Sequence, residues 1–266
     1  MRAIKSAPRD PDAPRKGIYL LPNLITTAAL FAGFYAVVAA MDGNFQKAAI
    51  AIFVALMLDG LDGRVARLTS TQSDFGKEFD SLADMVSFGL APALIVYQWG
   101  IESLAGYAWF WERLGWLAAF FFAVAAAMRL ARFNARGAQD DRRYFEGLPS
   151  PPAAALVAGY IWYQTEQALP ELTALVVAFA LTIAAGALMV SSIRYLSFKE
   201  FNLGQRVPFG YLLFIPLLFI IISLSPSRVL LAIAVIYAGS GPVTTGWMMI
   251  RKRRASKTND DEQNAA

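Results

Sequence analysis

The chain of 266 residues contains neither cysteine nor histidine. Without cysteine it has no disulfide, no thiolate nucleophile and no Cys-ligated zinc or iron–sulfur site. Without histidine it has no Ser-His-Asp triad and no imidazole that binds a metal or transfers a proton. Any catalysis must therefore rest on carboxylates, hydroxyls, amines or guanidiniums, or on a hard metal ion held by oxygen atoms.

Charge is also scarce, at 17% of residues, whereas hydrophobic residues make up 57%. A soluble domain has about 25% charged and roughly 45–50% apolar residues. Helices are the expected structure, because open strands would leave backbone groups unsatisfied in lipid. The sequence predicts an all-α polytopic membrane helical bundle of about eight transmembrane helices. The predicted spans are Leu20–Met41, Lys47–Arg67, Gly76–Trp99, Phe110–Phe133, Pro151–Tyr163 (which could extend past Gln164), Leu172–Ile193, Pro208–Leu224 and Arg228–Ile250.

Basic residues are distributed unevenly between the two sides of these helices. Of the 24 Lys and Arg residues, all but Lys47, Arg113 and Arg228 fall on the side that holds both termini. Cytoplasmic loops of membrane proteins carry such an excess of positive charge. The pattern predicts an even number of spans in the cell membrane, with both termini cytoplasmic.

The ends of the chain differ in composition from its centre. Residues 1–17 are rich in Pro and charge and are expected to form a mobile cytoplasmic arm. Residues 18–250 form the predicted transmembrane domain. Residues 251–266 are first basic and then acidic, which favours a disordered cytoplasmic tail.

Acidic residues gather in the second and third predicted helices. Asp59 and Asp62 are three apart, and Asp80 and Asp84 are four apart, so each pair lies on one face of its helix. The polar turn between the helices, residues 69–73, is short, which predicts that they pack antiparallel and bring the four carboxylates together. Charged side chains within membrane helices are costly and are functional candidates for that reason.

Four carboxylates this close repel one another unless cations compensate. With no His or Cys, the fitting ions are Mg²⁺ or Mn²⁺, and a bridged pair of them suits phosphoryl transfer. Gly60 and Gly63 leave room for a ligand or a neighbouring helix, and Arg67 is placed to meet phosphate oxygens. A single Asp could equally serve helix pairing or an ion relay. A transporter is the remote alternative, although the acids lie near the cytoplasmic ends and no inverted repeat is found.

Residues 59–84 fit the pattern D-x2-D-G-x2-A-R-x8-G-x3-D-x3-D at every fixed position, from Asp59 to Asp84. In this the chain resembles the CDP-alcohol phosphotransferase family, integral membrane enzymes that move a phosphatidyl or similar group from a CDP-linked donor to an alcohol. The resemblance implies two divalent cations held by Asp59, Asp62, Asp80 and Asp84, with Asp84 also the general base. It implies contacts with CDP and its phosphates from Gly63, Arg67, Ser73 and Gly76, and from Asn23 and Thr26 at the first helix, where Pro22-Asn23 could equally be a plain helix start.

Two further segments bear on the acceptor. Residues 128–134 and 145–153 resemble those of family members that use L-serine, which implies transfer from CDP-diacylglycerol to the serine hydroxyl, giving phosphatidylserine and CMP. A guanidinium from Arg129 or Arg132 would bind the serine carboxylate, and Asn134 or Glu146 would meet its ammonium group. The basic residues here could instead anchor the helix in the membrane. Glycerol 3-phosphate, inositol phosphate and choline remain the alternative acceptors.

The resemblance also suggests a homodimer embedded among membrane lipids, with no nucleic acid partner. Small residues at 125–127 and 184–187 could supply a close helix interface between two copies. Packing against lipid would explain them equally well.

Overall fold

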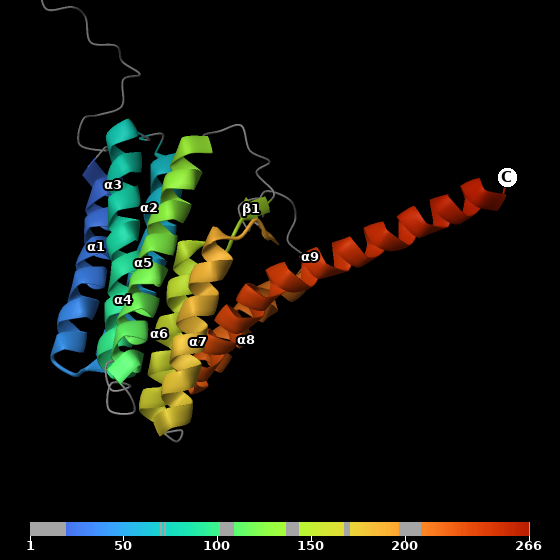
Figure 1. Ribbon diagram of the computed structural model, residues 1–266. Helices are drawn as coiled ribbons and strands as arrows, with labels where there is room; N and C mark the ends of the chain where they lie inside the picture. The colour runs from blue at the N-terminus through green and yellow to red at the C-terminus, as the bar shows by residue number, and fades with distance from the viewer. Residues whose placement is uncertain are drawn as a thin grey trace, which may run out of the picture.

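A computed structural model of the chain describes residues 20–69, 71, 73–101, 109–136, 144–167, 171–196 and 209–265. The predicted arm, residues 1–17, and the predicted start of a helix at Pro208 lie outside this part of the chain. The long helices form a bundle (Figure 1). They are α1 (Leu20–Met41), α2 (Phe45–Leu68), α3 (Asp74–Asp84) with its continuation, α5 (Trp109–Arg136), α6 (Ser150–Glu166), α7 (Glu171–Val190), α8 (Phe209–Leu224) and α9 (Pro226–Ala265).

The helical prediction is confirmed, because each predicted span corresponds to one long helical segment. Five segments are long and apolar enough to cross a bilayer: Leu20–Met41, Asp74–Gly100, Arg113–Ala135, Glu171–Val190 and Pro226–Trp247. Of the other three, α6 and α8 are only 17 and 16 residues long, and α2 carries the charged residues of the motif. The chain is a multi-pass membrane protein; the count of eight spans and the cytoplasmic position of the termini stay predictions.

The third span is one continuous helical run with two wide turns in it. After α3 come a π-helical segment η1 (Met85–Leu90), the short α4 (Ala91–Val96) and a second π-helical segment η2 (Tyr97–Ile101). Pro92 lies at the start of α4. A proline inside a helix has no N–H to donate and clashes with the carbonyl four residues earlier, and a π-helical turn relieves both effects. The sequence alone predicts an unbroken α-helix here.

Small side chains let the helices of the bundle pack closely. Alanines dominate the buried core. A Cβ atom added at Gly33 of α1 would lie 2.3 Å from Ser87 Oγ of η1, so only glycine fits there. The Ser87 hydroxyl in turn donates to the Ala29 carbonyl at 3.3 Å. Helix α1 is thereby fixed against the third span, just beyond the motif's last aspartate.

Small residues also join α5 to α7 inside one chain. Ala125, Ala126 and Ala185 are buried. A Cβ atom added at Gly186 would lie 2.7 Å from the Phe121 ring. Ala125, Ala126, Ala185 and Gly186 are therefore occupied by packing within the chain, whereas Ala127, Ala184 and Ala187 are exposed. A close interface between two copies stays a prediction.

A pair of short strands lies at the end of the bundle where α5 and α7 end. Strand β1 (Tyr144–Glu146) pairs antiparallel with β2 (Arg194–Leu196). Gly147 follows β1 with φ of 77°, and its N–H donates to the Ile193 carbonyl at 2.8 Å. This backbone conformation is one that glycine adopts freely. The strand pair therefore joins the connection between α5 and α6 to the connection between α7 and α8.

The C-terminal segment differs from its prediction. A disordered tail is expected for residues 251–266, but α9 continues as a helix to Ala265 and extends away from the bundle (Figure 1). Arg, Lys, Ala, Glu and Gln make up most of this segment, and no Gly or Pro follows Gly246. These residues are strong helix formers, so the helix of the last span has no residue that would end it. The structure thus shows a helix where the sequence favours a disordered tail, and the disorder stays a prediction.

Candidate active site

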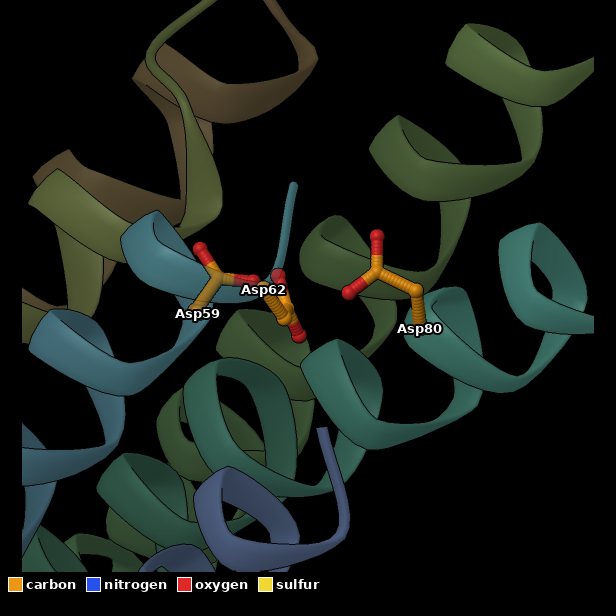
Figure 2. Close-up of side chains that lie close together, drawn as sticks. All are labelled: Asp59, Asp62 and Asp80. Carbon is orange, nitrogen blue, oxygen red and sulfur yellow. The ribbon is translucent and has the colours of Figure 1, made fainter. Parts of the chain in front are cut away.

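Three carboxylates of the motif come together between α2 and α3. Figure 2 shows Asp59 and Asp62 from α2 and Asp80 from α3 pointing toward one another. One oxygen from each lies within 4.8 Å of the others. Asp62 is the most deeply buried, at 5% exposure. As predicted from the short turn between α2 and α3, three of the four acids thus lie in one cluster.

Asp84 lies one helical turn beyond Asp80, at the junction with η1. It is not among the three carboxylates that lie within 4.8 Å of one another. Its carboxyl group is within hydrogen-bonding range of Asp59 and within electrostatic range of Asp80. The fourth predicted acid therefore borders the cluster on its inner side.

The three-acid cluster has the chemistry of a divalent-cation site. Its donor atoms are carboxylate oxygens, which Mg²⁺ and Mn²⁺ prefer, and two such ions in one site lie about 3.5–4 Å apart. A donor spread of 4.8 Å can be bridged by one or two ions of this kind with little movement. Like charges this close are costly in a membrane protein without such ions. The residues present fit the expected cations, while the identity and number of the ions stay predictions.

A pocket of about 620 Å³ opens beside the acid cluster. All six residues expected to contact CDP and its phosphates line it: Asn23, Thr26, Gly63, Arg67, Ser73 and Gly76. Asp62 and Asp80 also line it, so the pocket is continuous with the cluster. Residues from three segments, α1, α2 and the start of α3, thus meet around one cavity, next to the acids.

Two of these residues have structural partners as well. The Thr26 hydroxyl donates to Asp62 Oδ2 at 2.7 Å, and both side chains are buried. Ser73 is the N-cap of α3, where its hydroxyl accepts from the Gly76 N–H at 3.0 Å. Hydroxyl caps of this kind satisfy one of the free N–H groups of a helix start. Thr26 and Ser73 therefore hold the acid and the helix that form the pocket wall.

The two glycines that flank the acids of α2, Gly60 and Gly63, are not in close helix contacts among the described residues. A Cβ atom added at Gly60 would meet nothing within 4 Å in the described part of the chain. At Gly63 it would meet only the Arg67 guanidinium, at 3.7 Å. Of the two explanations that the sequence allows, room for a ligand is the one that the structure supports at Gly63, because that residue lines the pocket.

Arg129 lies on the other side of the acids, on α5. Its Nη1 donates to Ser150 Oγ at 2.9 Å, and it is within electrostatic range of Asp84 and Asp59. Its Nε is buried and has no hydrogen-bond partner among the described residues. The Arg129 guanidinium is thus fixed by α6 through Nη1, while its Nε–H remains available to donate to another group.

The other three residues expected to bind serine have different surroundings. Arg132 Nη2 donates to the Glu146 carbonyl at 2.8 Å and lies 3.4 Å from the Ser191 carbonyl, so it holds the strand pair onto α5. Asn134 Nδ2 donates to Ser81 Oγ at 2.9 Å and joins α5 to α3. Glu146 is in β1, next to Gly147. The structure gives Arg132 and Asn134 roles in packing, and their contact with serine stays a prediction.

Three polar residues that line the pocket are absent from the predicted site residues: Thr71, Asp74 and Lys77. They follow α2 or lie in the first turn of α3. Their polar character is ordinary for a turn, so composition gives no signal. The position of Lys77 next to Gly76 of the motif is the one indication that it faces the same ligand.

Comparison with known proteins agrees with this geometry. Residues 19–190 match the family model described as CDP-alcohol phosphatidyltransferase. A Helicobacter pylori protein named CDP-diacylglycerol–serine O-phosphatidyltransferase is 38% identical over 207 residues, which cover 78% of this chain and 84% of the relative. A yeast (Saccharomyces cerevisiae) protein of the same name is 37% identical over 153 residues, covering 52% of each chain. A third, from Methanocaldococcus jannaschii, is 37% identical over 147 residues, covering 54% of this chain and 61% of the relative.

Proposed function

Since the chain belongs to the CDP-alcohol phosphatidyltransferase family, we propose that it transfers the phosphatidyl group of CDP-diacylglycerol to the hydroxyl of L-serine, giving phosphatidylserine and CMP. The observation that carries the phosphatidyl transfer is the cluster of Asp59, Asp62 and Asp80 at the edge of the motif-lined pocket. The choice of serine rests on the names of the relatives, from a bacterium, a yeast and an archaeon.

The donor would bind with its CDP group in the pocket and its acyl chains in the surrounding lipid. Asn23 and Thr26 lie at the α1 side of this pocket, and Gly63 leaves space for the nucleotide. Arg67 would bind the pyrophosphate oxygens, because a guanidinium offers two parallel donors to a phosphate group. Lys77 lines the same pocket and adds a positive charge for the donor.

Two divalent cations, Mg²⁺ or Mn²⁺, held by Asp59, Asp62, Asp80 and Asp84, would supply Lewis-acid stabilisation of the negative charge on the phosphate oxygens. Asp84 accepts the proton of the serine hydroxyl. The serine oxygen forms a bond with the β-phosphorus, the bond from that phosphorus to the bridging oxygen breaks, and CMP leaves with the electron pair. Asp84 suits this task because it lies between the other acids and Arg129.

The acceptor would lie on the Arg129 side of the acids. The serine carboxylate pairs with the guanidinium, whose Nε is the buried donor that the described residues leave unused. This places the serine hydroxyl toward Asp84, within electrostatic range of the same guanidinium. The excess of basic residues at this end of the helices supports a site at the cytoplasmic face of the cell membrane, and the family resemblance favours a homodimer.

The proposed activity is tested with the purified protein in detergent micelles, CDP-diacylglycerol and Mn²⁺ or Mg²⁺. L-serine, glycerol 3-phosphate, inositol phosphate and choline are offered separately, and CMP release is measured. Release with serine alone is expected. Release only with another acceptor would contradict the serine assignment, and no release with any acceptor would favour the transporter alternative.

Replacing Arg129 by Lys is expected to raise the KM for serine by about tenfold or more, because lysine keeps the charge but loses the planar fork that binds a carboxylate. The KM for CDP-diacylglycerol should change little, since the donor pocket lies on the other side of the acids. Arg132→Lys is the matched control: it should lower the melting temperature, because Arg132 binds backbone carbonyls, and leave the KM for serine within about twofold. Equal effects of both variants on that KM would contradict the assignment.

A further inference from the structure

Strand β2 is joined to α9 through one buried tyrosine. Pro242 lies inside α9 and has no N–H, so the carbonyl of Ala238, four residues earlier, lacks its usual helical partner. The Tyr195 hydroxyl donates to this carbonyl at 3.0 Å. The position of the proline thus creates an acceptor in the middle of a helix, and a side chain from outside the helix satisfies it.

The backbone of α9 is shaped to receive the ring of Tyr195. A Cβ atom added at Gly241 would lie 2.4 Å from Tyr195 Cζ, so the ring rests directly on the glycine. Tyr195 is 1% exposed and is the largest of the fully buried side chains. Burial, and secondarily Tyr237, raises the pKa of Tyr195 to about 12, so its hydroxyl remains a hydrogen-bond donor at any physiological pH. We call Tyr195, Gly241 and Pro242 with the Ala238 carbonyl the β2–α9 lock.

The lock positions Tyr237, the residue immediately before Ala238. The rings of Tyr195 and Tyr237 lie 5.7 Å apart between centroids, at an interplanar angle of 35°. Tyr237 is half-buried and lies within electrostatic range of Arg129. Arg129 is held from its other side by Ser150, the first residue of α6, and α9 packs along α6. The guanidinium therefore lies between α6 and α9, beside the acids.

We infer that β2 and α9, which lie beyond the residues matched by the family model, complete the acceptor side of the active site. Tyr237 is a positioning residue that orients the Arg129 guanidinium toward the acceptor carboxylate, and the β2–α9 lock holds Tyr237 in place. The inference rests on the proposed function for the role of Arg129. In this inference, a segment outside the motif makes the enzyme selective for small hydroxylated amino acids over alcohols that have no carboxylate.

The test compares three Tyr→Phe variants of the full chain in micelles, after the acceptor panel has shown which alcohol the wild type uses. Tyr237→Phe is expected to raise the KM for the acceptor several-fold, because the Arg129 guanidinium loses a polar neighbour within electrostatic range. The KM for CDP-diacylglycerol should be unchanged. Tyr195→Phe should shift the same KM in the same direction and lower the melting temperature. Tyr160→Phe is the matched control, because Tyr160 also donates from a buried phenol to a backbone carbonyl, that of Ala174, at 3.0 Å.

The control should lower the melting temperature as Tyr195→Phe does and leave both KM values unchanged. The inference is overturned if Tyr195→Phe, like Tyr160→Phe, leaves the KM for the acceptor unchanged. It is also overturned if Tyr237→Phe changes the KM for the donor as much as that for the acceptor. A wild type that uses choline rather than serine contradicts the proposed function. It also contradicts the orienting of Arg129 toward a carboxylate, because choline has none. The positioning role of Tyr237 fails as well if the KM for choline is unchanged in Tyr237→Phe.

Discussion

Replacing Asp84 by Asn is expected to lower kcat by about 10³-fold, in the range that removal of a general base costs. The amide has nearly the same volume as the carboxyl group, but it accepts no proton at neutral pH. The substitution also removes one negative charge beside Asp59 and Asp80, so without bound cations the fold is relieved of repulsion rather than weakened. With cations bound, the variant loses one of their four predicted ligands. The measurement is CMP release under saturating donor and acceptor, together with the melting temperature.

Glu78→Gln provides the control for this variant. Glu78 is on the same helix, is exposed, and does not line the pocket. Its activity and melting temperature should match those of the wild type. Turnover in Asp84→Asn within about tenfold of the wild type would remove Asp84 from the role of base.

Removal of divalent cations is expected to abolish turnover and to destabilise the protein at the same time. Chelation takes away stabilisation worth several kcal/mol in the transition state, which corresponds to about 10³-fold in rate. The carboxylates of Asp59, Asp62 and Asp80 are then left to repel one another within 4.8 Å. A ligand at one hundred times its Kd contributes about 2.7 kcal/mol to the apparent free energy of unfolding. Addition of Mn²⁺ to the chelated protein should therefore raise the melting temperature by roughly 5 °C or more.

Asp62→Asn is the variant that tests the site of this effect. It should lose most of the Mn²⁺-dependent rise in melting temperature, whereas Glu78→Gln should keep it. Asp62 is chosen because it is the most buried acid of the cluster and is fixed by Thr26. A full rise in Asp62→Asn, measured without any substrate, would place the bound ion elsewhere.

The helices of this fold can be predicted well from sequence because lipid imposes a simple pattern. The first helix is predicted and observed at Leu20–Met41, and the seventh predicted span ends at Leu224, as α8 does. The same reasoning fails where a local backbone adjustment matters. The third span is predicted as one unbroken helix, and its apolar pattern does not indicate that π-helical segments lie on both sides of α4.

The cluster of three acids could also be predicted, because its residues are close in sequence. Asp59, Asp62 and Asp80 lie on two helices joined by a short turn, so helical periodicity is enough to bring them together. The surroundings of Arg129 and Arg132 could not be predicted, since they depend on segments that are distant in the sequence. Arg132 looks like a ligand residue by type, yet β1 and the end of α7 supply its acceptors.

The β2–α9 lock shows the same limit most clearly. Gly241-Pro242 within an apolar helix indicates that the Ala238 carbonyl is freed, and this much can be read from the sequence. The sequence does not show which group donates to this carbonyl, because Tyr195 is 43 residues away and belongs to a strand of three residues. Short strands of this kind have no alternation long enough to be recognised.

Helix α1 touches two parts of the site at once, since Asn23 lines the nucleotide pocket and Thr26 donates to Asp62. A ligand that fixes α1 through Asn23 also fixes the carboxylate that serves the cation. The two binding equilibria are therefore linked, and linkage is reciprocal: the factor by which Mn²⁺ tightens the binding of the CDP-linked lipid equals the factor by which that lipid tightens the binding of Mn²⁺. In a cell with little free Mn²⁺ or Mg²⁺, the supply of donor would then itself set how much of the enzyme carries its ions.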